Sequence, residues 1–105
     1  MNTLVLFLAL WHPPAWIVHA ANVAAAAADI ETTQSCLRSG RCRESNPLMP
    51  SNRAGAYAAG IALAGVEAAI AEHERRRGHR VWWLSPLASA GVHTGAAISN
   101  VVRFR

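Results

Sequence analysis

Three long stretches of small and apolar residues make up most of the chain, and each contains polar or ionisable side chains at helical spacing. They cover residues 15–37, 52–77 and 81–102. At about 1.5 Å per residue, a helix over 15–37 is about 34 Å long, enough to cross a bilayer core of about 30 Å. The sequence therefore predicts an all-α fold: a small helical membrane protein with three main transmembrane helices.

Composition supports this class. Charged residues make up 15% of the chain, against roughly 25% in an ordinary soluble domain. All ten basic residues are Arg, a bias typical of GC-rich bacterial genes. A soluble Ala-rich bundle is the alternative that composition leaves open.

Helix breakers set the boundaries within a single domain of residues 1–105. Pro13 and Pro14 lack the N–H donor and separate a short apolar segment, 3–11, from the first long helix. A polar connector over 38–51 leads to a second helix capped by Ser51 or Asn52 and ending before Gly78. Pro86 should bend or loosen the third.

The second helix is expected to be the weakest span, because few strongly apolar residues offset Glu67. Small residues suited to close helix packing are Gly60, Ala64, Gly91 and Gly95. Gly91 and Gly95 form a GxxxG match, for which packing within one monomer is favoured over a dimer face.

Seven polar residues are predicted to form an intramembrane cluster: His19, Asn22, Asp29, Thr33, Glu67, His93 and Asn100. Those on the first helix recur every three or four residues and so share one face. With Trp16 and Trp82-Trp83 at one interface, Asn22 and Glu67 lie about 9 and 10 Å deep. His93 and Asp29 lie deeper. Because unpaired charge is unfavourable there, we predict Asp29–His93 and Asn22–Glu67 pairs.

The cluster has two interpretations: hydrogen bonds that fix helix register, or a proton or ion site. A metal site built from His19, Asp29, Glu67 and His93 is disfavoured, because the ligands lie at unequal depths on three helices. No metal and no cofactor is predicted.

Cys36 and Cys42 are five residues apart and lie beside several Arg residues. A disulfide is sterically feasible, whereas no His in the connector supports a metal site. With three membrane crossings, six Arg residues lie on the same side of the membrane as the two cysteines, and four lie on the opposite side. This count favours a cytoplasmic location for the cysteines, where their thiols would be reduced.

The end of the predicted bundle where the second helix connects to the third is predicted to contact lipid head groups. The residues expected to make these contacts are Arg75, Arg76, Arg77, Arg80, Trp82 and Trp83. Within it, Glu72 is expected to pair with Arg76 and Glu74 with Arg77. Nucleic-acid binding is not predicted, because no aromatic-interleaved basic surface accompanies the charge.

Asp29-x-x-Thr32-Thr33, followed by Glu44-x-Asn46-Pro47, resembles a pattern of small bacterial integral membrane proteins of unknown function. The resemblance covers about residues 22–70 and implies a membrane location. It draws attention to Asp29, Thr33, Glu44, Asn46 and Pro47 and transfers no mechanism. By their own chemistry, Asn46-Pro47 suit a turn or helix start, and Glu44 suits the exposed amides there.

We therefore expect a multi-pass protein of the bacterial inner membrane that is a non-enzymatic structural or interaction component. Its expected partner is the lipid bilayer, with a second copy or another membrane protein left open. The first alternative is a proton- or ion-coupled transporter subunit using Asp29, Glu67 and His93. The second is a secreted, disulfide-closed domain released by signal-peptide cleavage within residues 1–28, although no basic residue precedes the apolar core.

Overall fold

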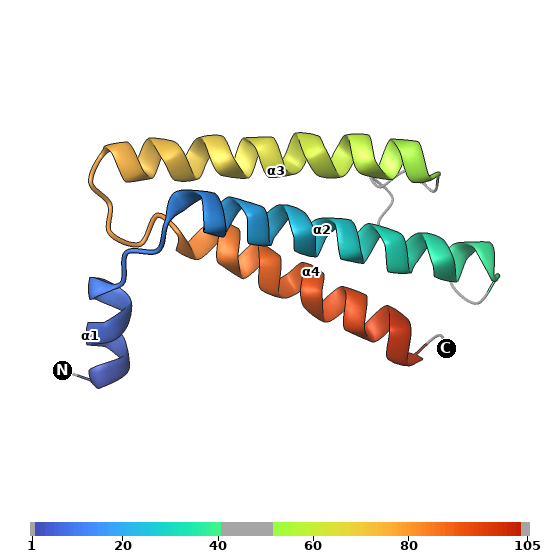
Figure 1. Cartoon of the computed structure of the whole chain (residues 1–105), viewed down its shortest axis with the longest axis horizontal. Coiled ribbons are helices and arrows are strands. Elements are labelled where there is room, and N and C mark those ends of the chain that lie inside the picture. Colours follow the sequence, from blue (N-terminus) through green and yellow to red (C-terminus); the bar gives the residue numbers. More distant parts are fainter. Residues whose placement is uncertain (1, 41–51, 104–105) are drawn as a thin grey trace.

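The computed structural model describes residues 2–40 and 52–103, and every regular element in these ranges is helical (Figure 1). The helices are α1 (Thr3–Leu10), α2 (Ala15–Arg38), α3 (Arg53–Arg76) and α4 (Leu84–Arg103). The predicted all-α class is confirmed.

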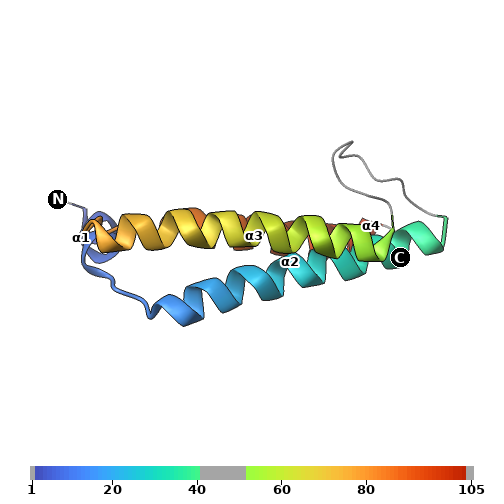
Figure 2. The same cartoon turned by 90° about the horizontal axis from the view of Figure 1, so that it is seen from above.

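The molecule is elongated, with extents of 49 × 27 × 21 Å, and its three long helices form a bundle with α2 in the middle (Figure 1). Helix α2 packs on both neighbours, most extensively on α4. Helix α3 runs antiparallel to α2 and α4, and the short α1 lies across the end where α3 connects to α4 (Figures 1 and 2). The opposite end holds the C-terminus.

Local chemistry explains most helix ends. Asn52 caps α3, where its Oδ1 accepts a hydrogen bond of 2.6 Å from the Gly55 N–H, as predicted for this position. Gly78 follows α3 with a φ of +80°, a conformation that favours glycine. Pro86 lies in the first turn of α4, where its missing N–H interrupts no helical hydrogen bond. Helix α4 accordingly begins at Leu84 rather than Val81.

The apolar core is small and lies at the α3–α4 connection. Val18, Ala71, Trp82 and Trp83 are buried together there. Trp11, which follows α1, meets the Trp83 ring edge-on, with centroids 4.8 Å apart, and so ties the N-terminal segment to the bundle.

Large apolar side chains instead cover the outside of the bundle. On α3, Ile61, Leu63, Val66 and Ile70 are all more than half exposed. The buried residues of α3 are two alanines, Ala56 and Ala71. The inside of the bundle therefore consists mainly of small and polar side chains.

By length and composition, α3 is the one helix among the described residues that is apolar enough to cross a membrane. By length and apolar composition, one membrane-crossing helix is therefore supported where three were predicted. The order of the helices is also reversed, because α3 was predicted to be the least favourable of the three spans. The two rankings differ in the weight that they give to alanine and glycine. Per-residue free energies of membrane insertion give these two residues little weight, so the unfavourable contribution of Glu67 is the largest for α3. Helices α2 and α4 fall short because each contains several polar residues, among them Asp29, His93 and Asn100.

The four small residues predicted to serve helix packing have different surroundings. A Cβ on Gly60 would lie 2.9 Å from Ile30 Cδ1, and Ala64 is partly buried. Gly91 and Gly95 are exposed, and a Cβ on either would meet no neighbour within 4 Å. The predicted packing of these two glycines within the monomer is therefore wrong, because α4 meets α2 through a different face.

We expect Gly60→Leu to destabilise the bundle by about 1–3 kcal/mol, because the added carbons overlap buried Ile30. Gly65→Leu on the same helix is the matched control, since a Cβ there meets nothing within 4 Å. Thermal unfolding of both purified variants in detergent measures the difference. Equal midpoints for the two variants would contradict the close α2–α3 approach.

Candidate functional site

A network of polar side chains runs along the inside of the bundle and connects α2 to both of its neighbours. All seven residues predicted to form the intramembrane cluster take part in it: His19, Asn22, Asp29, Thr33, Glu67, His93 and Asn100. Their shared face on α2 arises from the three- and four-residue spacing.

The first predicted pair is present between α2 and α3. Asn22 Nδ2 donates a 2.9 Å hydrogen bond to Glu67 Oε2. Ser89 on α4 donates to the other carboxylate oxygen, Glu67 Oε1, at 3.3 Å. Glu67 therefore accepts hydrogen bonds from both neighbouring helices. Ser89 was not among the predicted residues, because a serine among alanines is no signal by itself.

The second predicted pair is present between α2 and α4. His93 Nδ1 donates to Asp29 Oδ2 at 2.8 Å, and both side chains are about three-quarters buried. Thr33 donates to the other Asp29 oxygen at 3.4 Å. One turn further on, Asn100 uses both hydrogens of its amide, donating to Thr32 and Thr33 at 3.0 and 2.9 Å.

A charged group closes the network in the last turns of α3, beyond its apolar part (residues 54–71). Glu72 accepts from Arg75 Nη2 at 2.7 Å and from His19 Nε2 at 3.2 Å. The Arg75 guanidinium, with a smaller contribution from the His19 ring, lowers the pKa of Glu72 to about 2. The predicted Glu72–Arg76 and Glu74–Arg77 pairs are replaced by Glu72–Arg75 and Glu74–His79.

At the other end, sequence reasoning missed a contact between α2 and α3. Glu31 Oε1 accepts from the Tyr57 hydroxyl and pairs with Arg53 Nη2, each at 2.6 Å. Tyr57 lies one turn after Arg53 on α3, so the two can share one carboxylate. The only available sequence signal was the charge of Glu31 and Arg53 near adjacent helix ends.

Three ionisable groups of the network border one small cavity of about 30 Å³ between α2, α3 and α4. They are Asp29, Glu67 and His93, and Asn22 also lines the cavity. Asn22 Oδ1 is buried without a hydrogen-bond partner. A buried acceptor of this kind normally has a partner.

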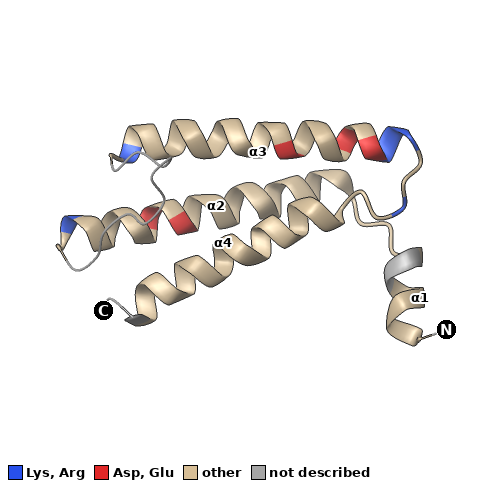
Figure 3. Cartoon of the chain, turned by 180° about the vertical axis from the view of Figure 1, so that it is seen from behind, with Lys and Arg blue, Asp and Glu red and all other residues tan. Residues whose placement is uncertain are grey.

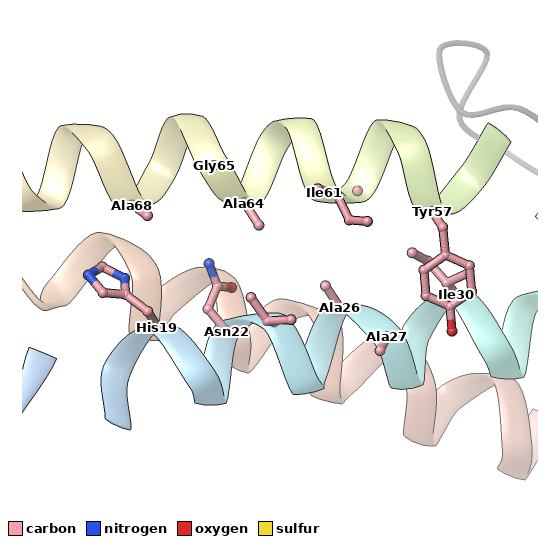
Figure 4. Close-up of a pocket in the computed structure, with 12 residues that line it drawn as sticks. His19, Asn22, Ala26, Ala27, Ile30, Tyr57, Ile61, Ala64, Gly65 and Ala68 are labelled. Atoms are coloured by element: carbon pink, nitrogen blue, oxygen red, sulfur yellow. The ribbon is translucent and has the colours of Figure 1, made fainter. Parts of the chain in front are cut away.

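A larger and more open space of about 390 Å³ lies between α2 and α3 (Figure 4). Its walls are mostly alanine, glycine and aliphatic side chains, with His19 toward one end and Tyr57 at the other. The Asn22 side chain extends from α2 toward α3 in this view.

The predicted head-group residues divide into two groups. Arg75, Arg76, Arg77 and Arg80 are exposed, and Arg positions lie at the ends of α2 and α3 and in the α3–α4 connection (Figure 3). Trp82 and Trp83 are instead only 8% and 4% exposed, because they form the apolar core. Their predicted head-group contact is therefore wrong.

The connector residues are mostly outside the described ranges: Cys42, Glu44, Asn46 and Pro47. Cys36, near the end of α2, is buried and disulfide-bonded. The reduced thiol expected from the Arg count is therefore wrong. The count was a poor guide because its margin was only six Arg residues against four.

Within residues 2–40 and 52–103, no three His, Cys, Asp or Glu side chains are arranged to hold a metal ion. The network supplies hydrogen bonds and ion pairs between helices.

Comparison with known proteins finds no matching family, no matching curated protein and no matching solved structure. Function must therefore be argued from the geometry of the chain.

The Asp29–His93 contact predicts a coupled pair of variants. We expect Asp29→Ala and His93→Ala each to lower stability in detergent, and the double variant to lose less than the sum, by about 0.5–3 kcal/mol. The physical reason is that the second substitution removes a partner already lost. Asp29→Ala combined with His79→Ala is the control, because His79 pairs with Glu74. Additive losses for Asp29 and His93 would contradict the contact.

Proposed function

We propose that this chain is a small multi-pass membrane protein that acts as a non-enzymatic structural or interaction component. The observation that carries the proposal is the distribution of polarity: large apolar side chains cover the outside of α3, whereas Asn22, Glu67 and Asp29 bond inside. A bilayer solvates such an apolar surface, and water does not.

The internal contacts also support membrane crossing by α2 and α4, which composition alone does not favour. Polar groups inside a bilayer are tolerated when they face the bundle and bond one another. Asp29 bonds His93, and Asn100 bonds Thr32 and Thr33, so these polar residues of α2 and α4 have partners inside the bundle. Three spans of the bundle therefore form part of the proposal.

The packing argues against removal of residues 1–28 as a signal peptide. Val18, Asn22 and Ala26 lie in this segment and are buried in the bundle. Cleavage before Asp29 would remove more than half of α2, the helix on which both neighbours pack. We therefore rank the secreted domain below the membrane protein.

For orientation, we propose that the α3–α4 connection faces the cytoplasm. Four Arg residues lie close together there: Arg75, Arg76, Arg77 and Arg80. The disulfide of Cys36 at the opposite end carries the argument, because disulfides persist outside the cytosol, and it outweighs the Arg count of six against four. Lipid head groups are the proposed contacts of these Arg residues and of exposed Trp16.

A proton- or ion-coupled component is the second candidate. The supporting observation is that Asp29, Glu67 and His93, from three different helices, border the same internal cavity. Ionisable groups at such positions frequently serve ion or proton movement.

We expect full-length protein to stay in the membrane fraction of expressing bacteria after an alkaline wash. The apolar outer surface would hold the helices in lipid when peripheral proteins are released. Intact mass spectrometry of the washed membranes and of the soluble and periplasmic fractions is the measurement. A shortened, soluble species that starts near Asp29 would replace the membrane proposal with the secreted alternative.

The orientation predicts that a cysteine placed at His79 is protected in intact cells. In a Cys36→Ser, Cys42→Ser background, His79→Cys should react with a membrane-impermeant maleimide only after the cells are opened. Ser39→Cys, near the other end of α2, is the control and should react in intact cells. The opposite labelling pattern would reverse the proposed orientation.

A further inference from the structure

We propose that the open groove of about 390 Å³ between α2 and α3 is a binding site for one anionic phospholipid. One acyl chain lies along the groove, and the phosphate head group lies at the Arg residues around the α3–α4 connection. The proposal rests on the membrane location proposed above and adds a specific ligand to it.

The lining of the groove suits a hydrocarbon chain. Alanine, glycine and aliphatic side chains form most of its walls, and His19 and Tyr57 lie toward its two ends (Figure 4). Between them, the amide of Asn22 is engaged by its 2.9 Å hydrogen bond to Glu67. Lining residues such as Ile61 are more than half exposed, so the groove opens onto the apolar outer surface and a lipid can enter from the side.

The dimensions fit one chain and exclude a helix. The groove follows residues 19–30 of α2, so it is about 16 Å long, close to half of a bilayer core of about 30 Å. A volume of about 390 Å³ over this length gives an average cross-section of about 24 Å². A helix with its side chains is about 10 Å wide and has a cross-section of about 80 Å². The groove therefore suits one acyl chain of one leaflet.

The His19 end of the groove carries an excess of positive charge. His19 bonds Glu72 at 3.2 Å, and Arg75 pairs with the same carboxylate at 2.7 Å. Residues 72–80 contain two Glu residues against four Arg residues, so two positive charges remain there when the histidines are neutral. Basic groups beside transmembrane helices bind anionic lipid head groups.

The Tyr57 end differs, which gives the lipid a direction. The Tyr57 hydroxyl bonds Glu31, and Arg53 is paired with that carboxylate at 2.6 Å. Trp16 is 73% exposed about one turn before His19, a position typical of a side chain at the membrane interface. The head group therefore lies beyond His19, and the acyl chain extends from there toward Tyr57.

The test is native mass spectrometry of the full-length protein in detergent, titrated with phosphatidylglycerol or with phosphatidylcholine of the same acyl chains. We expect the first phosphatidylglycerol to bind at least tenfold more tightly than later ones, because one formed site differs from general coverage of the outer surface. Phosphatidylcholine should bind more weakly at this first step, because its choline group cancels the phosphate charge.

One pair of variants locates the acyl chain. Gly65 lines the groove and a Cβ there meets nothing within 4 Å, so Gly65→Phe should place a ring in the groove and abolish the first binding step. Gly95→Phe is the matched control, because Gly95 has equally open surroundings on α4 and lies outside the groove. If Gly65→Phe does not fold, Val23→Trp obstructs the groove from its α2 wall.

A second pair locates the head group. Arg76→Gln leaves the Arg75–Glu72 pair in place and should lower the affinity for phosphatidylglycerol about fivefold, with little effect on phosphatidylcholine. Arg38→Gln, at the opposite end of α2 from His19, is the control and should change neither affinity.

Equal affinities for the first and later lipids, or a first step undiminished in Gly65→Phe, would overturn the proposal. Equal first-step binding of the two lipids, or an effect of Arg38→Gln in place of Arg76→Gln, would overturn the assignment of the head group. A dimer that Gly65→Phe separates would identify a second copy as the occupant instead. All of these measurements use detergent, so failure of the lipid site is distinguishable from failure of the membrane proposal, which the alkaline wash tests.

Discussion

The hydrogen bonds along the inner face of α2 are the interactions on which the rest of the structure depends. Helix α3 buries two alanines, so apolar burial contributes little to holding it beside α2. What joins them is a set of polar contacts at three levels: Glu31–Tyr57, Asn22–Glu67 and His19–Glu72. Between these levels, glycine and alanine permit close approach, most closely where Gly60 meets Ile30. In an apolar solvent, polar contacts and small-residue packing are the forces available for helix association.

The sequence predicted this polar face well because its information is periodic. Asn22, Asp29 and Thr33 recur at helical spacing, and simple depth estimates matched Asp29 with His93 and Asn22 with Glu67. Capping was equally local: Asn52 precedes α3, and Gly78 follows it. Such features depend either on neighbouring residues along one helix or on the depth of a residue along the bundle axis. Both can be estimated from the sequence before the three-dimensional fold is known.

Features that depend on rotation and lateral packing were not predictable in this way. Gly91 and Gly95 form a recognisable pattern, but nothing in it says which face of α4 meets α2. Trp82 and Trp83 look like interfacial residues by their position, yet they are buried with Val18 and Ala71, and the Trp11 ring packs against Trp83. Glu72 has Arg75 and Arg76 within helical reach, and the choice between them also depends on His19 from another helix.

The polar interior also explains why composition and geometry disagree about membrane crossing. A composition test weighs each helix alone, so it counts Asp29 and His93 as two unfavourable groups, although they bond each other across α2 and α4. Glu67 differs from Asp29 and His93 in having no oppositely charged partner among the described residues. Helix α3 passes the composition test, yet its carboxylate is bonded only to neutral groups among the described residues. Because α3 has little apolar burial, the hydrogen bonds from Asn22 and Ser89 to Glu67 are a main part of what holds α3 against α2 and α4.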